Sequence, residues 1–137
     1  LMSVRLGYNN FGPDGSAAIL RVLPTLTRLE ELHLGHADVS SEDGVELLPW
    51  SLTSLTSLQR LTLQGVGMGL SEAAALARCL PSLTALRVLA LGSNDIEDAG
   101  AAHLDNNRID EAGCAELSEW ARSHPNLTLS LNDNEGF

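Results

Sequence analysis

The chain has 137 residues, a length typical of a single domain. Hydrophobic residues make up 44% of it and aromatic residues only 4%, so leucine and alanine must form nearly all of the core. The net charge of −10 disfavours nucleic acid as a partner, because phosphate backbones are repelled, and favours basic protein surfaces. No apolar run approaches the roughly 18 residues that span a bilayer. No signal-peptide pattern opens the chain, so we expect a cytoplasmic protein without membrane insertion.

A template recurs along the chain, with leucine at positions one, four and six, asparagine at nine, isoleucine at eleven and glycine at fifteen. Its first four copies, here called repeats one to four, start at Leu1, Leu29, Leu58 and Leu86. The spacings are therefore 28, 29 and 28 residues, and repeat two carries one extra residue. A period of this length indicates an array of stacked strand–helix units.

Each repeat divides into a strand half and a helix half. Alternating apolar residues predict short strands at Val4/Leu6, Leu32/Leu34, Leu61/Leu63 and Leu89/Leu91. Leucines at helical spacing follow, and a proline is expected to end each helix, at Pro24, Pro49 and Pro81. One unit cannot bury both of its halves. We therefore predict an α/β solenoid, a horseshoe with a parallel concave β-sheet and convex α-helices.

Asparagine at position nine is the most specific mark of the template. Inside a turn its side chain satisfies backbone groups, and stacked turns would align these side chains in a ladder. The predicted ladder consists of Asn9, Asn94, Asn107 and Asn134. Repeats two and three have Ala37 and Val66 at this position, so we expect their turns to be looser or reshaped.

With strand, asparagine turn, glycine and proline-ended helix in place, the chain resembles the ribonuclease-inhibitor-like class of leucine-rich repeats over essentially its whole length. That class includes ribonuclease inhibitor, the Ran GTPase-activating protein and many ciliary and cytoskeletal scaffold proteins. Its members typically hold a protein partner with the concave face and its rim loops. The resemblance implies a non-enzymatic interaction or scaffold module that is part of a larger assembly. A cytoskeletal or ciliary assembly is one setting that the class allows. Two alternatives are a regulator of a small GTPase resembling the Ran GTPase-activating protein, and an inhibitor of a basic enzyme resembling ribonuclease inhibitor.

Residues 1–137 are expected to form one domain of about five to six repeats. The register breaks near residues 104/105, because Asn107 arrives roughly 15 residues too early for a fifth copy. We expect a missing stretch at this seam, with a genuine deletion as the alternative. A closing repeat is expected near Asn126. At the other end Leu1 opens without a polar cap, so the edge of the first strand is expected to lie against further residues or another subunit.

No catalytic residue, metal site, cofactor or small-molecule substrate is predicted. A nucleotide-binding P-loop cannot occur because the chain has no lysine, and the glycines around Met68 fall in a repeat turn. His33 and His36 lack the further ligands that a metal needs, so we assign them to the binding face. Cys79 and Cys114 match no metal or redox spacing and are expected to be buried thiols in a reducing compartment.

The surface predicted for the concave face is varied and polar in repeats one to three, and it includes the only tyrosine. Tyrosine and arginine are the usual anchors of protein interfaces. We therefore predict partner contacts at Arg5, Tyr8, Glu31, His33, His36, Arg60 and Gln64. On the convex side, Trp50 is expected to be an exposed anchor, whereas Trp120 is expected to pack within the closing repeat.

Overall fold

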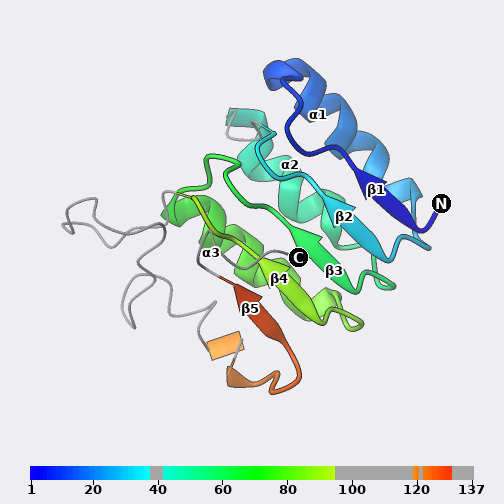
Figure 1. The fold of residues 1–137 in the computed structure, drawn as a ribbon, viewed down its shortest axis with the longest axis vertical. Coiled ribbons are helices and arrows are strands. Elements are labelled where there is room, and N and C mark those ends of the chain that lie inside the picture. The colour runs from blue at the N-terminus through cyan, green and yellow to red at the C-terminus, as the bar shows by residue number, and fades with distance from the viewer. Residues whose placement is uncertain (38–41, 95–118, 121, 131–137) are drawn as a thin grey trace.

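Strands and helices alternate along the chain in the computed structural model, which describes residues 1–37, 42–94, 119–120 and 122–130 (Figure 1). The strands are β1 (Ser3–Arg5), β2 (Glu31–His33), β3 (Arg60–Thr62), β4 (Val88–Ala90) and β5 (Thr128–Ser130). The helices are α1 (Gly12–Val22), α2 (Glu42–Leu52) and α3 (Leu70–Cys79). Single turns of 3₁₀ helix, η1 (Leu23–Thr25) and η2 (Leu80–Ser82), follow α1 and α3.

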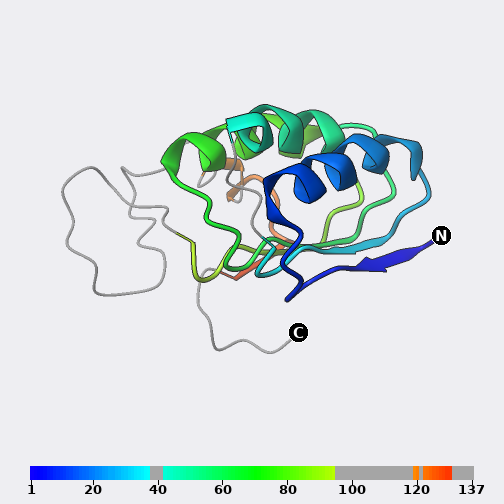
Figure 2. The ribbon, with the colours of Figure 1, turned by 90° about the horizontal axis from the view of Figure 1, so that it is seen from above.

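The strands form one parallel sheet in chain order, β1-β2-β3-β4-β5. Each strand pairs with the next at equivalent template positions, so Val4 lies opposite Leu32, Leu32 opposite Leu61, and Leu61 opposite Leu89. The three helices lie side by side over one face of this sheet (Figure 2). The predicted α/β class, with a parallel sheet and helices, is confirmed.

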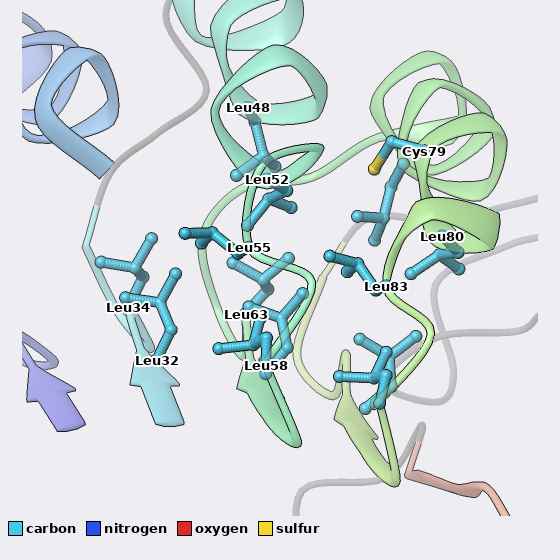
Figure 3. Packing of buried hydrophobic residues seen from close by; sticks show 14 of the residues in the cluster. Leu32, Leu34, Leu48, Leu52, Leu55, Leu58, Leu63, Cys79, Leu80 and Leu83 are labelled. Atoms are coloured by element: carbon cyan, nitrogen blue, oxygen red, sulfur yellow. The ribbon is translucent and has the colours of Figure 1, made fainter. Parts of the chain in front are cut away.

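Leucine forms the core, as the composition predicted. Leu32, Leu61 and Leu89 point from the sheet toward the helices and are 0% exposed. Leucines from α2, the 3₁₀ turns and the loops fill the space between the two layers (Figure 3). On the edge strand β1, Val4 and Leu6 are only partly buried, because no further repeat packs against them among the described residues.

The predicted role of proline as a helix terminator is right at two positions and wrong at one. Pro24 and Pro81 lie in η1 and η2, directly after their helices. Pro49 instead lies inside α2, which continues to Leu52. Pro49 is not the counterpart of Pro24 and Pro81: Leu52 corresponds to Leu23, where α1 has just ended, and Pro49 lies three residues before it. The proline ring therefore falls one turn before the helix end, where it removes one backbone hydrogen bond.

The turn of repeat three is held tightly by an asparagine from the next repeat. Asn94 is 6% exposed, and its Oδ1 accepts hydrogen bonds from the backbone N–H groups of Val66 (3.0 Å) and Met68 (3.1 Å). Its Nδ2 donates to the carbonyl oxygens of Leu63 (2.7 Å) and Leu91 (2.8 Å). Of the two outcomes expected for the third turn, looser or reshaped, a looser turn is not found, because a side chain of the next repeat satisfies its backbone groups.

Asn9 behaves differently from Asn94, since its Nδ2 donates only within its own turn, to Leu6 O (3.0 Å) and Gly7 O (3.2 Å). Several predicted features lie outside the described residues: Asn107, Asn134, Cys114 and the seam near 104/105. In the part of the chain that the structure describes, no helix is long and apolar enough to cross a membrane.

Candidate functional site

Three charged side chains gather on the sheet face that points away from the helices. Glu31 Oε2 accepts hydrogen bonds from Arg5 Nη2 (3.2 Å) and Ser3 Oγ (3.3 Å), and Glu31 Oε1 lies 3.9 Å from Arg60 Nε. The hydrogen bond from Arg5 lowers the pKa of the Glu31 carboxyl. Exposed ion pairs of this kind add little stability. Their effect is to orient the two guanidinium groups, and we call Arg5, Glu31 and Arg60 the charged cluster.

Beside the charged cluster, two polar side chains lie in register on neighbouring strands. His33 on β2 is opposite Thr62 on β3. His33 Nε2 and Thr62 Oγ1 are both enclosed and have no hydrogen-bond partner among the described residues. Burial, followed by the positive charge of Arg5, lowers the pKa of His33, which favours the neutral ring. Enclosed polar atoms without partners cost free energy in the unbound protein, and both lie on the face predicted to bind.

An aromatic pair occupies the turns that follow β1 and β2. The rings of Tyr8 and His36 stack with centroids 4.4 Å apart and an interplanar angle of 22°. Both residues have left-handed backbone conformations, with φ of 59° and 58°, although neither is glycine. Gly65 is their counterpart in repeat three, and a Cβ there would come within 2.5 Å of His36 Nδ1. The missing side chain of Gly65 is what lets the imidazole ring lie over that turn.

The predicted contact residues form two groups. Gln64 belongs with the aromatic pair, since its carbonyl oxygen accepts a hydrogen bond of 2.7 Å from the backbone N–H of His36. His33 belongs with the charged cluster, whose charges influence its pKa. The groups are separated by three to five positions along the chain, at most roughly 10–16 Å for an extended backbone. A single flat partner surface would touch both.

Sequence reasoning missed two hollows at the amino-terminal ends of the strands. One, of about 240 Å³, lies ahead of β2–β4, and the other, of about 360 Å³, lies ahead of β4 and β5. Gln59 and Arg87 line both, so we treat the hollows together as the amino-terminal groove. These residues occupy template position two, where no residue type is prescribed. The polar series Glu30, Gln59 and Arg87 at that position is the signal that would have found the groove.

The histidines, cysteines and tryptophans that the sequence singled out can also be placed. Within the described ranges, no group of three or more histidine, cysteine or acidic residues is placed to hold a metal ion. Cys79 is buried, which raises the pKa of its thiol to about 12. Trp120 is 7% exposed and stacks on His124, as expected for the closing repeat, whereas Trp50 is 54% exposed.

Neither a protein-family model nor a curated protein matches this sequence. The function is therefore inferred from the arrangement of these side chains.

Proposed function

We propose that this chain is a leucine-rich-repeat solenoid of the ribonuclease-inhibitor-like class, and that it is a non-enzymatic module that holds a protein partner. The partner lies against the sheet face and the turns at its carboxyl-terminal edge. The 28- to 29-residue spacing supports the class, as do parallel strands paired one repeat apart and a buried asparagine in the turn of repeat four. Each of these is a property of the repeat rather than of any one residue.

The aromatic pair is the observation that carries the binding role. Aromatic residues make up only 4% of the chain, and one of them, Tyr8, is 82% exposed instead of being used in the core. A left-handed backbone costs a non-glycine residue roughly 1–2 kcal/mol. The same template position is left-handed at Gly65 and Ser93 in repeats three and four, so the conformation belongs to the turn, and what distinguishes repeats one and two is that large aromatic rings occupy it. Exposed tyrosine is also among the residues that contribute most to protein interfaces.

The distribution of charge indicates which kind of partner surface the sheet face would bind. The described residues include eight acidic and seven basic side chains, so most of the net charge of −10 comes from the rest of the chain. The sheet face itself carries Arg5 and Arg60 against Glu31. This local balance favours a partner surface that offers carboxylates. It weighs against a blocker of a strongly basic enzyme, which would need an acidic face.

Matched aromatic substitutions test the proposal. The full-length protein, as wild type, Tyr8→Ala and Trp50→Ala, is used to capture partners from the cells that produce it, and the proteins captured are identified by mass spectrometry. Tyr8 lies on the proposed face and Trp50 on the helical layer, and both are exposed. We expect Tyr8→Ala to weaken the partner's affinity by about tenfold or more and Trp50→Ala to leave it unchanged.

Two results would contradict the proposal. Loss of the partner with Trp50→Ala, but not with Tyr8→Ala, would assign binding to the helical layer. Capture of a small GTPase whose hydrolysis of GTP is accelerated by the protein would replace the scaffold role with that of a GTPase regulator.

A further inference from the structure

Polar side chains that have no partner among the described residues line the larger hollow of the amino-terminal groove. Arg87, Gln59 and Asn126 all border it, and within the described part of the chain none of their side chains makes a hydrogen bond or ion pair. Among the described residues, none that lines this hollow is acidic. A guanidinium and two carboxamides therefore offer donors to one space of about 360 Å³.

This hollow results from a departure from the template. Position one is a buried leucine in repeats two, three and four, where Leu29 and Leu58 are 0% exposed and Leu86 is 9% exposed. The closing repeat has Asn126 at this position, and Asn126 is exposed. The leucine that would have packed beside Leu86 is thus replaced by a short polar side chain. The space it leaves is open to solvent and polar on one side.

We propose that the amino-terminal groove binds an acidic side chain from an extended segment of the protein partner, with its carboxylate on Arg87. This inference rests on the proposed binding function and specifies the chemistry of the partner. A carboxylate accepts two parallel hydrogen bonds from a guanidinium, and the amides of Gln59 and Asn126 supply further donors.

The smaller hollow explains why a peptide, rather than a free anion, is the occupant. It continues the groove toward β2 and is lined by Glu30 and Glu31 in addition to Arg60, Gln59 and Arg87. At that end the charges of Glu30 and Glu31 offset those of the arginines, and Arg60 lies 3.9 Å from Glu31, so a free anion gains little there. A peptide chain presents backbone N–H groups there as well as its carboxylate at the other end, so it matches both halves of the groove.

The test measures peptide binding to the full-length protein by fluorescence anisotropy. The probe is a labelled peptide of alternating serine and glutamate, and its control has glutamine in place of glutamate. Arg87→Gln is compared with Arg78→Gln, which removes the same charge from an exposed arginine on α3. We expect Arg87→Gln to weaken binding of the glutamate peptide by about tenfold or more, as for the loss of a charge-assisted hydrogen bond. Arg78→Gln should change it less than about twofold.

A second variant checks the shape of the hollow. Asn126→Leu restores the template leucine, so it should fill the space and abolish peptide binding without lowering stability. Equal effects of Arg87→Gln and Arg78→Gln, or equal affinity for the two peptides, would overturn the proposal. If acetate alone bound at Arg87 as tightly as the peptide, the occupant would be a small anion and the peptide assignment would fall.

Failure here is distinguishable from failure of the proposed function. If capture of the partner depends on Tyr8 but not on Arg87, only the proposal of an acidic segment in the groove is refuted. If capture depends on neither residue, both the proposed binding function and the proposed acidic segment are refuted.

Discussion

Replacing Asn94 with alanine tests whether one side chain joins repeats three and four. The substitution removes two acceptor contacts, to Val66 N and Met68 N, and two donor contacts, to Leu63 O and Leu91 O, together with a longer donor contact of 3.4 Å to Gly92 O. The first four are short, and Asn94 is 6% exposed, so the backbone groups have little access to water. A net contribution of about 1 kcal/mol for each bond, with the added penalty of buried unpaired groups, gives a loss of roughly 3–5 kcal/mol.

The same substitution at Asn9 is the matched control. Asn9 holds the same template position, but it is exposed and its side chain makes two contacts within one turn. Water replaces those contacts, so Asn9→Ala should cost less than about 1 kcal/mol. Asn94→Asp separates the two halves of the interaction, because it keeps the acceptor oxygen and loses both donors. It should destabilise at least as much as Asn94→Ala, since a carboxylate oxygen would then face two carbonyl oxygens.

Urea unfolding followed by circular dichroism measures these differences as changes in the free energy of unfolding. The reasoning would be refuted if Asn94→Ala cost less than about 1 kcal/mol, or if Asn9→Ala cost as much as Asn94→Ala.

Three further predictions concern other positions. Gly65→Ala should lower the free energy of unfolding by about 1–3 kcal/mol, because its φ is +60° and the new Cβ meets the ring of His36 at 2.5 Å; in a His36→Ala background, urea titration should show a smaller loss. The pKa of His33 is lower in the folded protein than its ordinary value of 6.5, so the unfolded chain binds more protons and stability should fall as the pH drops below about 6.5. His33→Gln should flatten that dependence in unfolding curves recorded between pH 5 and pH 8. With Cys114→Ser in place, the native thiol of Cys79, whose pKa is about 12, should react with iodoacetamide at pH 8 at least about a hundredfold more slowly than in urea, and equal rates would contradict its burial.

The sequence predicted the strands and their pairing because these depend on a pattern repeated four times. Leu32 and Leu61 alternate with polar residues, and Leu89 holds the same template position between Val88 and Ala90, so the repeats support one another. The same alternation placed Arg5, Glu31 and Arg60 on one face. It could not predict the stacking of Tyr8 and His36, which depends on left-handed backbone conformations and on the absence of a side chain at Gly65.

The misplaced helix end in repeat two has a different origin. Proline usually terminates a helix, and that rule was applied to Pro49 from its own residue type. The helix end is set by packing instead, because Leu52 must reach the position that Leu23 occupies in repeat one. Both leucines are buried, at 0% and 2% exposure, and burying a leucine contributes about as much free energy as the lost hydrogen bond of the proline costs. The helix therefore continues through Pro49 to Leu52, which keeps the leucine in the core.

Neighbouring repeats explain the remaining surprises. Parallel pairing places each template position about 4.8 Å from the same position in the next repeat. A residue missing from one repeat is thus within reach of a side chain from another, as Asn94 serves the turn around Val66. A smaller or more polar residue in one repeat also leaves space beside another repeat. Asn126 opens a hollow beside Leu86, and Gly65 makes room for the ring of His36. Departures from the template therefore have their effects one repeat away, and the candidate binding features of this protein arise at those departures.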